Sequence, residues 1–160
     1  MRGNVVRVAT DSTTLFTDAL ITTASETENV ILPGAIAAGK HCRSIIRHLV
    51  VASVQQLAWE IVFFATRNFA TAPLIQSSYI ASFQFAAGNS KQYTPTGPFY
   101  YQATNIDLPY QDLDFENLQL PQAERGGTLH VMLVNRSPTA KLAGPTGAIQ
   151  LVCYLEPTYG

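Results

Sequence analysis

Short runs of β-branched and aromatic residues, separated by proline and glycine, constrain the fold of this chain more than any other feature. Pairs such as Pro-Gly, Gly-Asn, Gly-Gly and Gly-Pro stand between the runs, and these residues fix turns. Helix-type periodicity is nearly missing, so the pattern predicts an all-β chain. The five clearest predicted strands are Ile45 to Val51, Trp59 to Ala65, Ser78 to Phe85, Thr128 to Asn135 and Ile149 to Leu155.

The number and spacing of the strands predict two packed sheets. Residues 128–135 are largely apolar on both faces, which is typical of a strand in the middle of a sandwich. About eight short strands with regular breaks predict an antiparallel two-sheet sandwich with jelly-roll topology. Weaker strands are expected at Val5 to Ala9, Leu20 to Thr23, Val30 to Leu32 and Asn105 to Leu108.

The length of 160 residues suits a single domain. We expect residues 41–160 to form the β-sandwich, and residues 1–40 to be either an N-terminal arm or its first strands. Cys42 and Cys153 lack metal-ligand spacing, so two buried free thiols are expected, with a disulfide as the alternative. The N-terminus has no apolar signal-peptide core, and polar residues interrupt the apolar stretch 49–66, which argues against a membrane segment.

Charged residues make up only 13% of the chain, against about 25% in an average soluble domain. Few charges give little protection against association, so we expect a subunit of an assembly; a weakly charged monomer is the alternative. The net charge of −1 gives no general attraction to nucleic acid or to an anionic membrane.

Catalytic and metal-binding motifs are not found. The three histidines form no His-x-His pair, which argues against a cupin-type metal enzyme, and neither a G-x-S-x-G elbow nor a phosphate-binding glycine loop occurs. His130 lies within a predicted strand, where a packed or hydrogen-bonded imidazole is expected. We therefore predict no enzyme and no cofactor; an unfamiliar enzyme would need a pocket lined by Asp112, Asp114 and a histidine.

Two oppositely charged segments are candidate contact sites. Lys40, Arg43 and Arg47 belong to a basic stretch, and Asp112, Asp114 and Glu116 to an acidic one. They suit contacts between copies of the chain or with another protein lattice, unless they neutralise each other within one monomer. One alternative is that the three acidic residues bind Ca²⁺. Another is that Arg43 and Arg47 face solvent on an edge strand and protect it from pairing with other chains.

Tyrosines supply the remaining candidate contacts. Tyr100 and Tyr101 lie in a Pro/Gly-rich region, and Tyr159 lies next to the last residue. Exposed tyrosines in loops suit protein interfaces and sugar stacking alike.

Residues 106–160 carry a resemblance to a known class of proteins. The runs IDLPYQDLDFENLQLP and GGTLHVMLVNRSPTAKLAGPTGAIQLVCYLEPTYG, with the earlier WEIVFF, resemble the decoration (cement) proteins that coat tailed-bacteriophage capsids. The resemblance implies a β-sandwich or jelly roll that binds the outside of the major capsid protein lattice as a dimer or trimer.

From this resemblance we expect a virion protein, made in the host cytoplasm, that stabilises the capsid by bridging major capsid protein subunits. The alternative is a tail- or fibre-associated jelly-roll module that binds host carbohydrate. Such a module would use Trp59 or the aromatic residues between Tyr93 and Tyr110.

Overall fold

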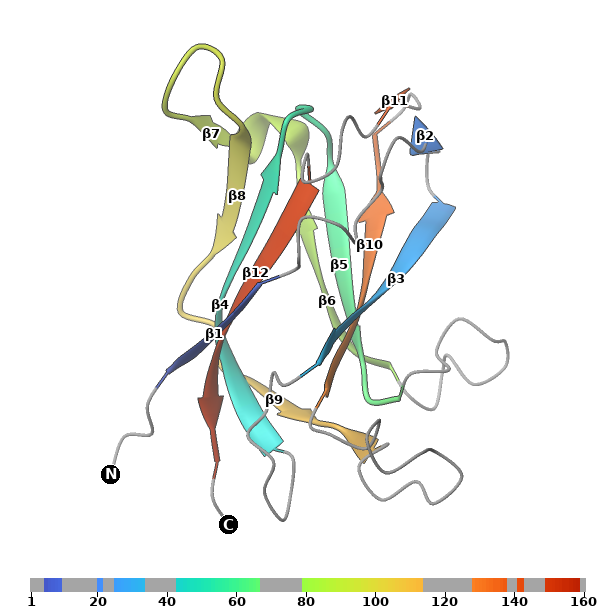
Figure 1. The fold of residues 1–160 in the computed structure, drawn as a ribbon, viewed down its shortest axis with the longest axis vertical. Coiled ribbons are helices and arrows are strands. Elements are labelled where there is room, and N and C mark those ends of the chain that lie inside the picture. The colour runs from blue at the N-terminus through green and yellow to red at the C-terminus, as the bar shows by residue number, and fades with distance from the viewer. Residues whose placement is uncertain are drawn as a thin grey trace.

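The computed structural model describes residues 5–9, 20–21, 25–33, 43–66, 79–113, 128–137, 141–142 and 149–158. Strands dominate these residues, with one short 3-10 turn, η1 (Ala87–Asn89) (Figure 1). The strands are β1 (Val6–Ala9), β2 (Leu20–Ile21), β3 (Ser25–Pro33), β4 (Arg43–Ser53), β5 (Trp59–Phe64), β6 (Tyr79–Phe85), β7 (Lys91–Gln92), β8 (Phe99–Ala103), β9 (Leu108–Gln111), β10 (Thr128–Asn135), β11 (Lys141–Leu142) and β12 (Ile149–Pro157).

The strands form two antiparallel sheets that face each other. The β4 sheet has the order β1-β12-β4-β8-β7, with β9 also paired to β4, and the β10 sheet has the order β3-β10-β5-β6. The short strands β2 and β11 pair separately. Successive long strands cross repeatedly between the two sheets, which is the jelly-roll arrangement. The predicted all-β, two-sheet jelly-roll sandwich is therefore confirmed.

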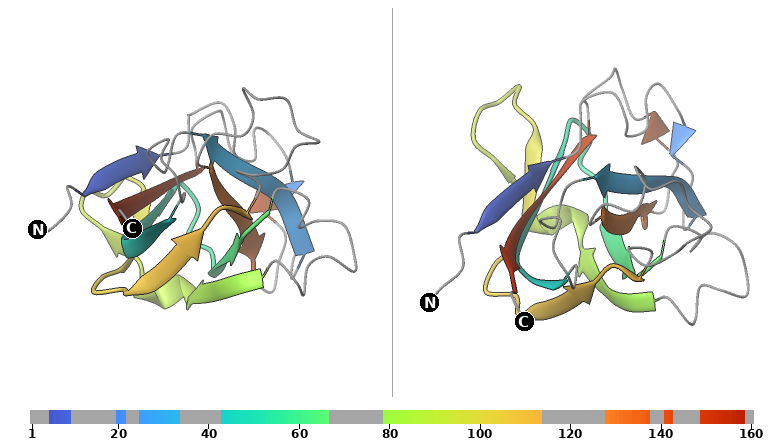
Figure 2. Two further views of the ribbon diagram at one scale, coloured as in Figure 1. Left: turned by 90° about the horizontal axis from the view of Figure 1, so that it is seen from below. Right: turned by 60° about the horizontal axis from the view of Figure 1, so that its bottom comes forward.

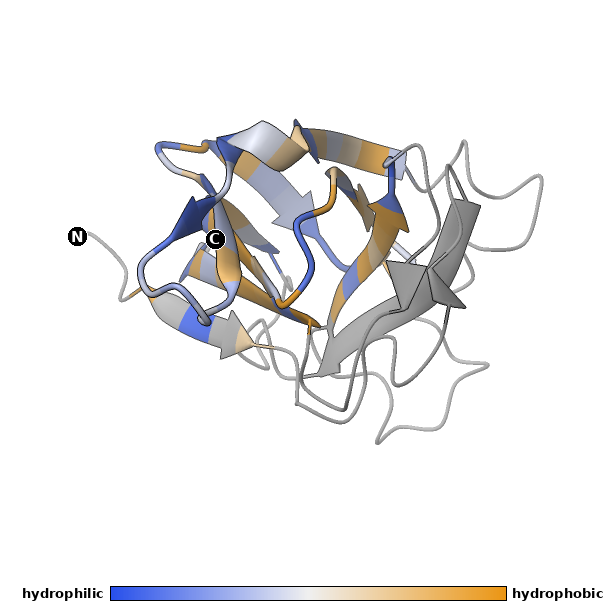
Figure 3. Cartoon of the chain, turned by 90° about the horizontal axis from the view of Figure 1, so that it is seen from above, coloured by the Kyte–Doolittle hydropathy of each residue, from blue (hydrophilic) through white to orange (hydrophobic). Residues whose placement is uncertain are grey.

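The core lies between the two sheets, where inward-facing residues of the long strands meet. In β4 and β12 these include Leu49, Val51 and Leu151, all fully buried. They pack in one cluster with residues of β5 and β10, including Phe63 and Val131. Figure 3 shows hydrophobic residues along the coloured strands, interrupted by hydrophilic ones. Full burial of such a side chain stabilises the fold by about 1.5–3 kcal/mol.

A bulge in β4 bends the β4 sheet at Arg47. His48 pairs with Tyr154 and Ile46 pairs with Leu155, so Arg47 is the extra residue. On the other side of β4, β8 pairs with residues 49–53 and β9 pairs with residues 43–46. The amide of Ile106 bridges the gap between β8 and β9 by donating to the Arg47 carbonyl at 3.1 Å.

Two strand predictions need correction in this region. The strand expected at residues 105–108 is instead β9 (Leu108–Gln111), because Asn105 adopts a φ of 57° that ends the extended backbone. Residues 99–103, interpreted as part of a loop, form β8. The idea that Arg43 and Arg47 protect an edge strand is also wrong, since β4 lies between β12 and the β8/β9 pair.

The described parts of residues 1–40 include strands of the sandwich. β1 pairs with β12, and β3 pairs with β10. Cys153 is a free, fully buried thiol, and Cys42 lies outside the described residues. Among the residues that the structure describes, no helix is long and apolar enough to span a membrane.

Candidate functional site

β9 closes one end of the sandwich and brings the candidate site together. Figure 2 shows β9 crossing this end between the two sheets. The backbone amide of His130, in β10, donates to the Tyr110 hydroxyl at 2.8 Å. Just beyond β9, the Leu113 amide donates to the Ala65 carbonyl at 2.9 Å. These two hydrogen bonds attach the β4 sheet to the β10 sheet at the end where β4 begins.

Asp112 and His130 form a buried pair at the same end. His130 Nε2 lies 3.0 Å from Asp112 Oδ1, and the side chains are 0% and 1% exposed respectively. The expected hydrogen-bonded role of His130 is confirmed. Asp112 presents no surface to a partner, which corrects its assignment as a contact residue. Asp114 and Glu116 lie outside the described residues, and no group of three possible metal ligands occurs within the described part of the chain.

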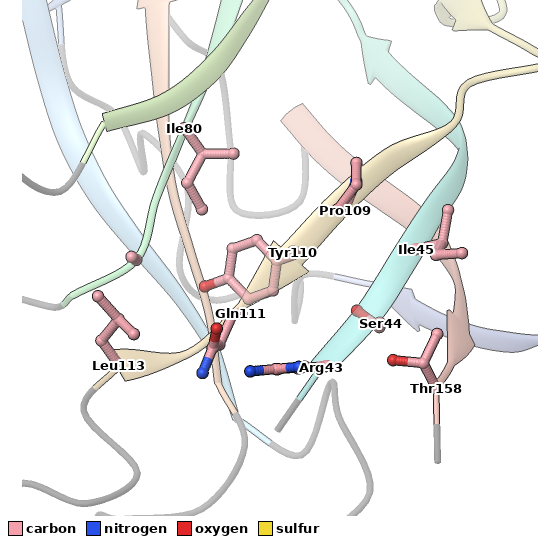
Figure 4. Close-up of a pocket in the computed structure, with 10 residues that line it drawn as sticks. Arg43, Ser44, Ile45, Ile80, Pro109, Tyr110, Gln111, Leu113 and Thr158 are labelled. Carbon is pink, nitrogen blue, oxygen red and sulfur yellow. The ribbon is translucent and has the colours of Figure 1, made fainter. Parts of the chain in front are cut away.

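An open cavity of about 550 Å³ lies beside this closure, and we call it the end cleft (Figure 4). β4, β6, β9 and the residues that follow β5, β9 and β12 supply its walls. The described lining residues are Arg43, Ser44, Ile45, Ala65, Ile80, Pro109, Tyr110, Gln111, Leu113 and Thr158.

The end cleft combines apolar walls with a few polar groups. Leu113 is 52% exposed, and Arg43 is also exposed, so both are accessible from outside. The Ser44 hydroxyl is buried and has no hydrogen-bond partner among the described residues. The Thr158 amide donates to the Arg43 carbonyl at 3.0 Å, which fixes the backbone at this edge. Such a cleft can receive apolar side chains, with the Arg43 guanidinium available to a carboxylate.

Arg47, the other predicted basic contact, is engaged within the chain. Its guanidinium contacts Asp107 at 2.6 Å and Glu156 at 2.7 Å. Arg47 is therefore neutralised within one monomer, by Asp107 and Glu156 and not by Asp112 of the acidic segment. Sequence reasoning could not pair these residues, because they are 60 and 109 positions apart.

A second cavity lies at the opposite end of β4, and we call it the β7–β8 groove. It measures about 290 Å³ and is lined by Asn89, Lys91, Tyr100, Gln102 and Thr104. The Tyr93 ring is tilted against the Tyr100 ring with centroids 5.6 Å apart. The sequence predicted the tyrosines here as contact residues, but it did not predict the amides of Asn89 and Gln102 or Lys91. Alternation along residues 100–104 would have grouped Tyr100, Gln102 and Thr104 on one face.

Tyr101 and Trp59 point into the core, which corrects their assignment as surface residues. Both side chains are 0% exposed. The Tyr101 hydroxyl accepts a hydrogen bond from the Leu57 amide at 2.9 Å, and burial raises the pKa of this phenol. Neither ring can stack on an external ligand. The remaining predicted contact residues, Lys40 and Tyr159, lie outside the described residues.

No protein-family model and no curated protein sequence matches this chain. Two solved structures resemble it. One is the coat protein dimer of Tobacco streak virus, at a TM-score of 0.30 and 8% identity, covering 100% of this chain and 91% of that chain. The other is the T13 viral particle of IBDV, at a TM-score of 0.27 and 13% identity, covering 100% of this chain and 37% of that chain. One neighbour is a viral coat protein and the other is a viral particle, and likeness at these TM-scores carries no weight for the function or the partners of this chain.

Proposed function

We propose that this chain is a non-enzymatic structural protein of a phage particle, which binds the outer surface of the capsid and bridges major capsid protein subunits. The end cleft is the observation that carries the proposal, since it offers a preformed apolar recess at one end of a rigid sandwich. Anchor residues of protein interfaces typically fill such recesses.

The stretch of sequence that resembles phage decoration proteins also lines part of the end cleft. Residues 106–160, which resemble phage decoration proteins, contribute Pro109, Tyr110, Gln111, Leu113 and Thr158 to the cleft. The same stretch supplies β10 and β12, which are interior strands of the two sheets. The part of the chain that resembles capsid-coating proteins therefore both builds the scaffold and shapes the recess.

The buried polar groups at this end make the walls of the end cleft rigid. Asp112, His130 and Tyr110 are held in contacts that connect the two sheets, so the walls of the end cleft are fixed before a partner arrives. Rigid interfaces lose less conformational entropy on binding. A dimer or trimer of the chain would add avidity, because several end clefts would engage a repeating lattice together.

Cosedimentation with expanded, empty heads that lack the protein tests the proposal. Leu113→Asp places a charge at the exposed wall of the end cleft, and we expect it to weaken binding at least tenfold. Val54→Asp is the matched control, since Val54 is 46% exposed and follows the opposite end of β4. The proposal fails if wild-type protein does not pellet with heads, or if both substitutions act equally while the variants keep wild-type circular dichroism.

A further inference from the structure

The β7–β8 groove has the composition of a ligand site, and it lies away from the end cleft. Tyr100 pairs with Ala52 across β4, whereas the end cleft begins at Arg43. At about 3.3 Å per residue, these two positions of β4 are roughly 30 Å apart. Figure 1 shows β7 and β9 at opposite ends of the sandwich. The two cavities share no lining residue among those described.

Strand geometry places the groove residues on one face. Tyr100, Gln102 and Thr104 alternate along the chain in and just after β8, and Lys91 pairs directly with Tyr100. The neighbouring residue Tyr101 points into the core, so this face is the outer one. Gln102, Thr104 and Lys91 are exposed, and Tyr100 is half-buried. The groove is therefore a set of accessible polar groups beside an aromatic ring.

The rim of the groove is ordered by its own hydrogen bonds. The Ser90 hydroxyl donates to the Ala87 carbonyl at 3.0 Å, and Gln56 Nε2 donates to the same carbonyl at 3.2 Å. These bonds hold the turn that carries Asn89. On the other side, Gln92 Nε2 donates to the Gly97 carbonyl at 2.7 Å, which orders the hairpin that carries Tyr93. The turn and the hairpin that border the groove are thus ordered without a ligand.

We infer that the β7–β8 groove binds a saccharide that carries a carboxylate. The aromatic face of Tyr100, supported by Tyr93, suits stacking against the C–H face of a sugar ring. The amides of Asn89 and Gln102 each offer a donor and an acceptor, which matches hydroxyl groups that both donate and accept. Lys91 adds a single point charge, which selects a sugar with a carboxylate over a neutral one. The volume of about 290 Å³ is on the scale of a small-ligand pocket.

An array of neutral and uronic-acid-containing oligosaccharides, probed with the full chain, tests this inference. We expect binding to the acidic sugars, with Tyr100→Ala lowering affinity at least tenfold. Lys91→Gln should reduce the preference for acidic over neutral sugars several-fold without abolishing binding. Tyr79→Ala is the control, because Tyr79 is a 50% exposed tyrosine on the β10 sheet and should leave binding unchanged.

Three results would overturn the inference: no signal on the array, a preference for neutral sugars, or equal losses in Tyr100→Ala and Tyr79→Ala. Thermal unfolding of each variant shows whether a loss of binding comes from the groove or from the fold. The sugar-binding test is independent of the proposed capsid role. A protein that fails to bind heads can still bind sugar in the groove, and a protein that binds no sugar can still bind heads.

Discussion

Arg47 Nε donates to Glu156 Oε2 at 2.7 Å, across the bulge that bends β4. Nη1 of the same guanidinium donates to Asp107 Oδ1, so one side chain joins β4, β12 and the segment between β8 and β9. Arg43 begins the same strand and instead lines the exposed end cleft. Two arginines four positions apart therefore have different roles, one inside the chain and one at its surface.

Replacing Arg47 with alanine should lower the free energy of unfolding by about 0.2–1 kcal/mol, because its ion pairs are partly exposed to water. Urea titrations at low and high sodium chloride measure the effect, and the loss should shrink at high salt. Arg43→Ala is the matched control, expected to change stability less. An equal loss in both variants would contradict the assignment of the internal role to Arg47.

Replacing Asp112 with alanine should destabilise the fold by about 1–3 kcal/mol, because it removes a buried carboxylate that contacts the fully buried His130 imidazole. Asp107→Ala serves as the control, since that carboxylate is 76% exposed. Equilibrium denaturation followed by Trp59 fluorescence reports the difference. Similar midpoints for the two variants would show that the Asp112–His130 contact does not hold the sheets together.

The Cys153 thiol should stay protonated and unreactive in the folded protein, because complete burial raises its pKa. In a Cys42→Ser background we expect no reaction with a thiol reagent until the chain unfolds. Since only the unfolded thiol ionises, stability should fall by up to about 1.4 kcal/mol per pH unit above roughly pH 8.5. Cys153→Ala should flatten this part of the pH profile, and a profile unchanged by that substitution would contradict the prediction.

Gly97→Ala should disturb the hairpin beside the β7–β8 groove. A Cβ at this position would lie 2.3 Å from the Thr94 hydroxyl oxygen, so the Thr94 side chain must leave its place. We expect a loss of about 0.5–1.5 kcal/mol, the scale of an off-rotamer side chain. Gly88→Ala is the control, because nothing lies within 4 Å of the added atom. Thermal unfolding compares the two, and a larger loss at Gly88 would contradict the geometry.

The sequence predicted the strands that are rich in core-facing apolar residues. It missed the strands whose extended conformation depends on pairing with a neighbouring strand. Residues 59–64 and 128–135 are rich in apolar residues and form the expected strands β5 and β10. Residues 99–103 lack such an apolar run, because Tyr100 and Gln102 face outward and resemble loop residues in the sequence. They form a strand because they pair with β4. Pro109 interrupts the usual sequence signal for a strand, and β9 tolerates it because, among the described strands, β9 pairs with β4 on one side only.

The candidate site was predictable only in part, because its contacts join distant positions. Arg43, which lines the end cleft, was predicted to be a contact residue from its basic neighbourhood, and that role stays a prediction. Nothing in the sequence near Asp112 pointed to His130, which is 18 positions away and reaches it only through the crossing of β9. Charge and spacing therefore identified candidate charged residues in the sequence. The pairing of the strands determines which of these side chains are buried.

A cryo-electron microscopy reconstruction of the intact particle, combined with the native mass of the free protein, tests the central claim most directly. The account predicts a small jelly roll at regular positions on the outer capsid surface, with the β9 end against the shell and contacts to more than one major capsid protein subunit. Absence of the protein from the particle, or its presence in the tail alone, would contradict the account.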